Sequence, residues 1–221
     1  MKKSILIMVA LFTIGFMLQS CGKSSEKKEN ETSESQTTKS DTMNMNKMNN
    51  DMMYSMNSMM TKMKDMKMTG DFDLDFATMM MMHHQAAIDM SEVEVAKGND
   101  TQIKTMAQNI ITTQKAEIEQ IQQFVKKYKM PKAKMENGKM HDELAETMKI
   151  MMDEMMNMQM SNNLDKDFVM MMIRHHEGAV TMAKDEIAHG KQSELKTMAQ
   201  KMITDQTKEI KDFNAWLASQ K

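Results

Sequence analysis

Two short segments of the chain combine methionine with adjacent histidines and could bind a soft metal ion. The first reads MMMMHHQAAIDM at residues 79–90, and the second reads MMIRHHEGAVTM at residues 171–182. In each segment a methionine precedes each histidine by four residues, a spacing that lets the two side chains meet over one helical turn. Thioether sulfur is soft and selects Cu(I), whereas imidazole also binds Cu(II). The pattern therefore predicts a copper site. The predicted ligands are Met79, Met80, His83, His84 and Met90 in the first segment and Met171, Met172, His175, His176 and Met182 in the second.

Polar residues in the apolar stripe of the following helix could orient these imidazoles. Gln114 and Gln206 stand in the middle of such stripes, three residues before Glu117 and Glu209. A buried polar group needs a hydrogen-bond partner, and the histidine helix is the nearest candidate. We therefore expect these four residues to form a second shell around the metal ligands.

A packing interpretation of the same residues must be weighed against the ligand interpretation. Methionine at helical spacing usually fills irregular gaps in a hydrophobic core, and two adjacent histidines can form a structural pair inside a bundle. The chain nevertheless contains 36 methionines. Leucine would pack equally well at these positions, so packing alone does not explain the choice of methionine. The recurrence of methionine four residues before histidine, in both segments, favours metal binding over packing alone.

The two segments belong to an internal duplication. Residues 75–120 align without a gap to residues 167–212, and the repeats share the string KTMAQ. Other identical pairs are Phe76 with Phe168, Ala87 with Ala179, Glu94 with Glu186 and Gly98 with Gly190. The same offset pairs methionines upstream of both motifs, so each repeat is about three helices long.

The composition predicts an all-α fold. The chain has 7 glycines and 1 proline, and it is rich in straight-chain residues that favour helices. Apolar residues at helical spacing predict helices over residues 43–68, 73–97, 101–127, 140–160, 165–189 and 193–219. Short turns at the two repeated glycines are typical of antiparallel helix pairs in bundles.

The N-terminal region predicts export and membrane anchoring. Lys2 and Lys3 precede a short apolar run, and the segment ends in LQSC, which resembles the lipobox of bacterial lipoproteins. We expect residues 1–20 to be a lipoprotein signal peptide and Cys21 to carry the lipid. Cys21 is the only cysteine, so the exported domain can offer neither disulfides nor thiolate ligands. Residues 21–42 contain almost no apolar residue and are expected to form a disordered tether. The first repeat then covers residues 43–128, a linker 129–139, and the second repeat 140–221.

The motif regions are similar to the family named domain of unknown function 305. Members carry a pattern close to DxxFxxxMxxHHxxAxxMA followed by a glycine turn and a QxxEI helix. In this chain the pattern reads DLDFATMMMMHHQAAIDMS with QKAEI, and DKDFVMMMIRHHEGAVTMA with QTKEI. The resemblance implies a ferritin-like four-helix bundle made of two helix pairs, to which this chain adds a methionine-rich helix before each pair. It also implies kinship with exported, methionine-rich copper-binding proteins associated with copper tolerance.

These features predict a lipid-anchored protein of the bacterial cell envelope, facing the periplasm or the exterior, that sequesters or transfers Cu(I) and possibly Cu(II). The sequence leaves open whether the chain keeps the copper or transfers it to a partner protein. The formal net charge of −2 offers no basic field for nucleic acid, and no catalytic constellation is recognisable, so we expect no enzyme. Two other functions stay open. One is a ferritin-like di-iron oxidase, which needs a Glu-x-x-His motif on two helices, whereas the chain has this spacing once, at Glu186 and His189. The other is an oxidant sink based on methionine.

Overall fold

The computed structural model describes residues 51–129 and 142–220, and this part of the chain contains six helices and no strand. The predicted all-α class is confirmed, whereas a ferritin-like arrangement remains a prediction. The signal peptide, the tether, Cys21 and most of the linker lie outside the described residues. The first helix covers residues 51–64 and is followed by α2 (Phe72–Lys97), α3 (Thr101–Lys127), α4 (Asp142–Met156), α5 (Leu164–His189) and α6 (Ser193–Ser219).

The four long helices, α2, α3, α5 and α6, begin and end within one residue of their predicted bounds, and side chains cap the N-termini of α2, α3 and α5. The Asp71 side chain accepts a hydrogen bond from the backbone N–H of Leu74 at the start of α2. Asp100 does the same for α3, and Asn163 for α5. Such caps satisfy N–H groups that have no partner within the helix.

The two methionine-rich helices end earlier than predicted. The first ends at residue 64 instead of 68, and α4 ends at Met156 instead of 160. In both repeats a turn follows, with a left-handed residue at Gly70 (φ 77°) and at Asn162 (φ 62°). Asp75 fixes the first turn by accepting hydrogen bonds from the backbone and hydroxyl of Thr69, and Asp167 binds Ser161 in the same way. These side-chain bonds compete with continued helix.

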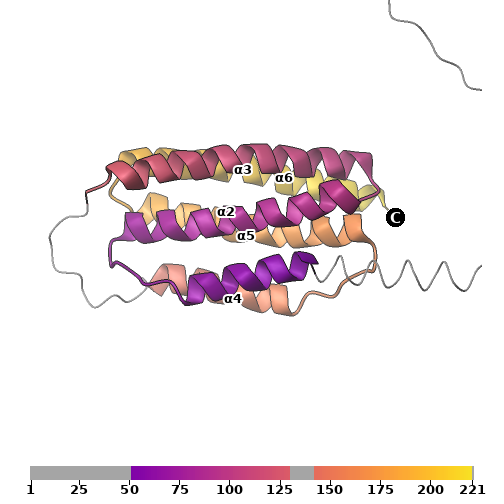
Figure 1. Cartoon of the computed structure of the whole chain (residues 1–221), viewed down its shortest axis with the longest axis horizontal. Coiled ribbons are helices and arrows are strands. Elements are labelled where there is room, and N and C mark those ends of the chain that lie inside the picture. Colours follow the sequence, from indigo (N-terminus) through magenta and orange to yellow (C-terminus); the bar gives the residue numbers. More distant parts are fainter. Residues whose placement is uncertain (1–50, 130–141, 221) are drawn as a thin grey trace, which may run out of the picture.

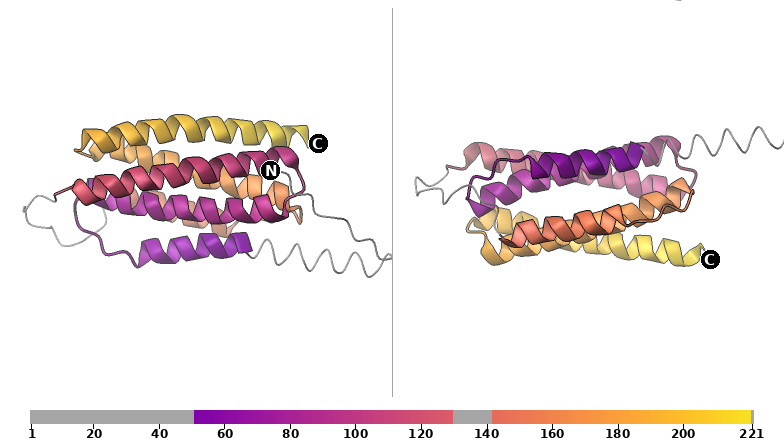
Figure 2. Two further views of the ribbon diagram at one scale, coloured as in Figure 1. Left: turned by 45° about the horizontal axis from the view of Figure 1, so that its top comes forward. Right: turned by 90° about the horizontal axis from the view of Figure 1, so that it is seen from below.

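The helices form three layers, each of which pairs one helix from each repeat (Figure 1). Helices α2 and α5 pack against each other in the middle layer. Helices α3 and α6 cover one side of this pair, and the helix of residues 51–64 and α4 cover the other (Figures 1 and 2). The histidine helices are therefore enclosed from both sides.

Two reciprocal contacts align α2 and α5 antiparallel. Asp73, in the first turn of α2, accepts hydrogen bonds from the backbone N–H groups of Lys191 and Gln192 at the turn after α5. Asp165, in the first turn of α5, accepts hydrogen bonds from the N–H groups of Asn99 and Asp100 at the turn after α2. Each repeat thus clamps the turn of the other. The clamps set the register that brings the middles of α2 and α5 together.

A buried glutamate adjoins each clamp. Burial, followed by a hydrogen bond to Asp165, raises the pKa of Glu94 to about 8. Burial and the charge of Asp73 raise the pKa of Glu186 to about 9. No donor among the described residues faces either carboxyl oxygen of Glu94, so burial favours the protonated form of this carboxyl group. Gly98 leaves room for this carboxyl group, since a Cβ there would overlap it.

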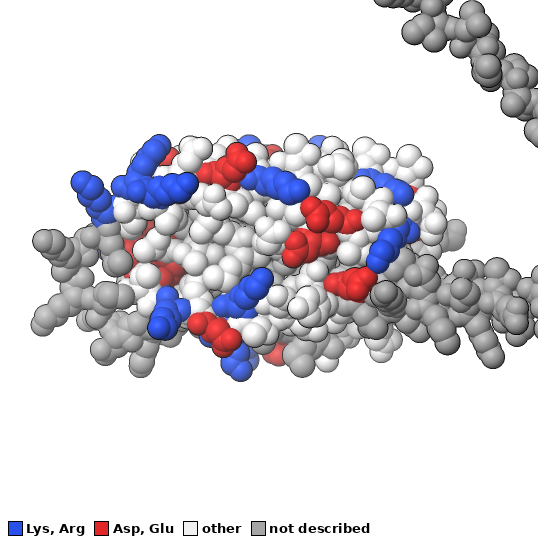
Figure 3. All heavy atoms as spheres, viewed as in Figure 1, with Lys and Arg blue, Asp and Glu red and all other residues white. Residues whose placement is uncertain are grey.

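Methionine dominates the core that surrounds the middle layer. The buried methionines of the first helix and α4 include Met52, Met56, Met59, Met60, Met63, Met148 and Met151. They pack in one cluster with the methionines and phenylalanines of α2 and α5. No helix in the described part of the chain is long and apolar enough to cross a membrane. On the face drawn in Figure 3, acidic and basic side chains are interspersed.

Candidate metal centre

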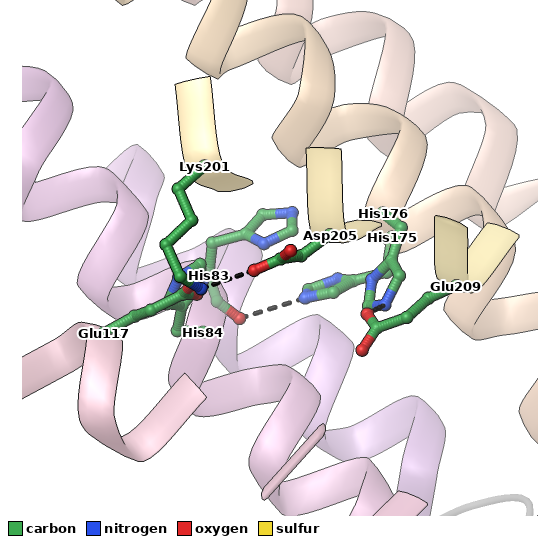
Figure 4. A network of polar contacts seen from close by, with 8 residues as sticks. All are labelled: His83, His84, Glu117, His175, His176, Lys201, Asp205 and Glu209. Atoms are coloured by element: carbon green, nitrogen blue, oxygen red, sulfur yellow. Dashed lines mark hydrogen bonds and ion pairs between the residues drawn. The ribbon is translucent and has the colours of Figure 1, made fainter. Parts of the chain in front are cut away.

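The four predicted histidine ligands meet at the middle of the molecule. His83 and His84 lie at the centre of α2, and His175 and His176 lie at the centre of α5. All four side chains are 0% exposed. Because α2 and α5 are antiparallel with their centres opposed, the two His-His motifs face each other across the interface (Figure 4). The sequence left open whether the repeats build one shared cluster or two, and the structure has one shared cluster.

The inner pair of this cluster is His83 and His175. Their rings are stacked, with centroids 3.6 Å apart and planes inclined by 20°. His175 Nε2 lies 3.0 Å from the backbone carbonyl oxygen of His83. A carbonyl only accepts, so this nitrogen donates, and neutral His175 then carries an unprotonated Nδ1. That Nδ1 and both ring nitrogens of His83 are buried without a hydrogen-bond partner among the described residues.

The outer histidines each contact a glutamate from the neighbouring helix. His84 Nε2 lies 3.0 Å from Glu117 Oε2 on α3, and His176 Nε2 lies 2.7 Å from Glu209 Oε2 on α6. These are hydrogen-bond distances, although the ring N–H groups are not aligned for a hydrogen bond. The structure thus places two of the four predicted second-shell residues beside imidazoles.

The two outer contacts differ in their surroundings. Lys201 Nζ reaches from α6 to Glu117 at 3.4 Å and also contacts Asp205 (Figure 4). The side chain of Glu117 is 6% exposed, whereas that of Glu209 is 23% exposed. The first repeat therefore holds its glutamate deeper and beside a neutralising lysine.

Burial keeps the inner histidines uncharged. The pKa of His83 is well below its ordinary value because of desolvation, followed by the charges that His175, His84 and His176 would carry. Desolvation and His176 likewise lower the pKa of His175. The neutral imidazole is the form that binds a metal ion. These two rings can therefore act as ligands at neutral pH without first losing a proton.

The predicted thioether ligands are all buried beside this cluster in sequence. The side chains of Met79, Met80, Met90, Met171, Met172 and Met182 are each 0% exposed and belong to the central core. They lie on the same two helices as the histidines and belong to the same core. Their roles as ligands remain a prediction.

The two predicted glutamines are also buried in the centre of the bundle. Gln114 is 2% exposed and Gln206 is 3% exposed. Neither side-chain amide has a hydrogen-bond partner among the described residues. Unpartnered buried amides cost free energy. Packing alone therefore does not explain why both glutamines lie between their own helices and the histidine helices.

One further sulfur, which the sequence did not single out, lies near His83. Met151 of α4 and His83 both approach Gly178 of α5. The available signal was the duplication itself, because the repeat alignment sets Gly178 against Ala86. Among the described residues, no group of three or more His, Cys, Asp or Glu side chains is arranged to hold a metal ion.

Comparison with solved structures points to metal-binding proteins. The protein CopM in its Cu(II)-bound form is 30% identical, with a TM-score of 0.52 over 67% of this chain and 97% of that chain. Its Cu(I)-bound and Ag-bound forms each give 30% identity and a TM-score of 0.50 over 66% of this chain and 96% of that chain.

A second relative shares the fold. A DUF305 protein of Streptomyces coelicolor, described as a candidate secreted protein, is 22% identical, with a TM-score of 0.52 over 68% of this chain and 94% of that chain. A comparison with curated proteins gave no match.

The family follows from the sequence motifs and from these likenesses. The model of the family described as domain of unknown function (DUF305) matches residues 14–125 and 73–217. These two overlapping segments include both His-His motifs and the described helices as far as residue 217 of α6. The chain belongs to the DUF305 family.

Proposed function

We propose that this chain is an exported, lipid-anchored protein that binds copper and sequesters it or hands it to another protein, and so contributes to copper tolerance. Cu(I) is the main cargo, and Cu(II) is a second one. The protein performs no catalysis in this proposal.

One observation carries the proposal: the stacked pair of His83 and His175. Burying a polar group without a hydrogen-bond partner costs free energy, and this centre buries three unpartnered ring nitrogens on two side chains. A protein selected only for stability would place apolar side chains there. A cation that accepts the lone pairs of His175 Nδ1 and of the unprotonated nitrogen of His83 gives these two atoms the partner that the folded chain does not supply.

The surrounding sulfur supports copper over other metals. The core around the histidines is built largely of methionine, and thioethers select Cu(I) over harder ions. CopM, which is 30% identical, is known in Cu(I)-bound and Cu(II)-bound forms. The N-terminal sequence supports the cell envelope as the place of action, since Cys21 ends a signal-like segment.

Competition with a Cu(I) chelator tests the binding. We expect the purified protein, under reducing and oxygen-free conditions, to withdraw Cu(I) from a chelator of known affinity. Mg(II) should not compete at equal concentration, because it prefers oxygen ligands, and Zn(II) should compete only weakly, because thioether sulfur favours Cu(I). A protein that leaves the Cu(I) chelator fully loaded is not a copper-binding protein.

Replacement of Cys21 tests the anchor. The variant Cys21→Ser cannot receive a thioether-linked lipid, so we expect it to move from the membrane fraction to the soluble fraction of fractionated cells. The matched control is Ser20→Ala, which keeps the cysteine and should remain with membranes. A Cys21→Ser protein that stays membrane-bound would exclude anchoring through this residue. That result would not count against the proposal that the protein binds copper.

A further inference from the structure

We propose that the metal centre is one-sided: Met151 of α4 and His83 of α2 form a binding site for a soft monovalent cation, and Gly178 of α5 opens it. The inference rests on the proposed function and assigns it a sulfur ligand and a route from solvent. The first repeat has the corresponding residues but lacks the opening.

The geometry at Gly178 places sulfur and nitrogen around one small space. A Cβ built on Gly178 would lie 2.9 Å from Met151 Sδ and 3.7 Å from His83 Nε2. The missing side chain therefore leaves a gap that the Met151 thioether occupies, with His83 Nε2 at its edge. His83 Nε2 is completely buried and has no hydrogen-bond partner, so its position toward this gap is not explained by bonds within the protein.

The pseudo-twofold symmetry of the duplication is broken at this point. The repeat alignment pairs Gly178 with Ala86 and Met151 with Met59. Ala86 is buried at 2% exposure and carries the methyl group that Gly178 lacks, whereas Gly178 is half-buried. The inner histidines differ accordingly. Nε2 of His175 donates to the carbonyl of His83, but no reciprocal bond ties up Nε2 of His83.

A surface pocket leads to the gap. A cavity of about 150 Å³ lies between α4 and α5, and its lining includes Met151 and Gly178. Glu154 and Glu177 also line it, together with Arg174, which pairs with Glu177 at 2.7 Å. The two carboxylates against one guanidinium leave a net negative charge, which attracts a cation.

The equivalent pocket of the first repeat is less suited to a cation. It lies between the helix of residues 51–64 and α2, and its lining includes Met59, Ala86 and Lys62. Lys62 takes the place that Glu154 has in the second repeat, and Gln85 takes the place of Glu177. Asp89 also lines the first pocket and offsets Lys62, so that pocket has no net charge, whereas the pocket of the second repeat is negative and attracts a cation. Both differences direct the ion to the second repeat.

The chemical class of the ligand follows from the two donor atoms. A thioether and a neutral imidazole carry no charge and favour soft ions with low coordination numbers, such as Cu(I) and Ag(I). Met151 has three rotatable bonds, so a bound ion can draw its sulfur toward His83 Nε2. The pocket brings such an ion to Met151 and Gly178, and His83 Nε2 lies directly behind them.

Silver nitrate is the probe of choice, because Ag(I) keeps its oxidation state in air. The variants are Gly178→Ala, which fills the gap, and Met151→Leu, which keeps the apolar volume and removes the sulfur. Met59→Leu is the matched control in the first repeat. We expect both test variants to lose Ag(I) affinity by at least about tenfold, in line with the effect of disturbing a metal site, and Met59→Leu to bind like the unchanged protein.

Methyl spectra of protein labelled at the methionine methyl carbon identify the ligand directly. The resonance that is missing from Met151→Leu should be among the first to shift when Ag(I) is added. If Gly178→Ala unfolds, Met151→Leu decides the question, because it does not alter the α5 backbone.

The outcomes separate this inference from the proposed function. If the unchanged protein binds neither Ag(I) nor Cu(I), copper binding itself is wrong. If it binds Ag(I) and Met151→Leu binds equally well, the Met151 site is wrong while the proposed function stands. Equal losses in Met151→Leu and Met59→Leu would overturn the one-sided arrangement.

Discussion

Replacing His83 and His175 together with leucine is expected to weaken Cu(I) binding by at least about a hundredfold and to leave the metal-free protein as stable as before, or more stable. Changes to outer-shell partners alone cost a metal site 10–100-fold in affinity, so the loss of two direct ligands should cost about a hundredfold or more. Both effects arise from the same feature, the unpartnered nitrogens of two buried rings.

The expected gain in stability comes from removing polar atoms that nothing satisfies. Leucine is close to histidine in volume and is fully apolar, so it avoids the desolvation cost of about 1–3 kcal/mol for each unpartnered group. The His83 carbonyl loses its contact with His175 and the ring stacking is lost, which offsets part of this gain. We expect a net change between zero and about 2 kcal/mol in favour of the variant.

Chemical denaturation of the metal-free proteins measures the stability, and chelator competition measures the affinity. His189→Leu is a control, because it removes an exposed histidine at the end of α5. A double variant that binds Cu(I) as tightly as the unchanged protein would show that the inner pair is not the ligand set. One that is clearly destabilised would show that the two imidazoles hold the fold together.

The helices themselves were predictable from the sequence because their signals are local. The bounds of α3 and α6 agree with the prediction at both ends, since apolar spacing, capping residues and the glycine turns lie within each segment. The predicted ends of the two methionine-rich helices were wrong because the stop is not local to them. It is set by Asp75 and Asp167, which lie in the next helix and bind back to the turn.

The meeting of the two histidine motifs was beyond the reach of sequence periodicity. The helical period shows that His83 and His84 flank an apolar face, but it does not show which helix covers that face. That choice follows from the antiparallel docking of α2 on α5, which the clamps by Asp73 and Asp165 align over long sequence separations. In the sequence these aspartates look like ordinary first-turn acids.

The difference between the repeats was equally hidden. Gly178 opposite Ala86 is a one-atom change in the side chain, and the alignment gives it no more weight than any other mismatch. Its consequence needs a third helix, because Met151 reaches the gap from α4. A contact among three separate segments cannot be inferred from the spacing within any one of them.

The second large effect is expected from the buried glutamates at the clamps: the double variant Glu94→Gln/Glu186→Gln should be more stable than the unchanged protein at alkaline pH. Burial raises the pKa of Glu94 to about 8 and that of Glu186 to about 9, from ordinary values near 4.5. Each folded carboxyl therefore holds a proton that the unfolded chain releases between these pH limits. Where the folded state binds more protons, stability falls as the pH rises.

The magnitude follows from this linkage. For each glutamate the stability contribution is full below about pH 4.5, and it declines by up to about 1.4 kcal/mol per pH unit until the pH passes the folded pKa. Glutamine does not titrate, and its amide can still donate to Asp165 or Asp73. The advantage of the variant should thus be small at pH 5 and grow steadily to pH 9. In a chain of this size each kcal/mol corresponds to about 2–4 °C in melting temperature.

Melting curves at pH 5, 7 and 9 measure the trend, and the comparison removes titrations that both proteins share. Lys104 near Glu94 and Lys196 near Glu186 oppose the pKa rise, but they are present in both proteins and cancel. Glu119→Gln, an exposed change on α3, controls for the loss of a negative charge and should show no such trend. A difference in melting temperature that stays constant from pH 5 to pH 9 would mean that these carboxyls are ionised in the folded protein. Asp73 and Asp165 would then hold the turns without a proton from the neighbouring glutamate. The close approach of each glutamate to Gly98 or Gly190 would need an explanation other than room for a protonated carboxyl group.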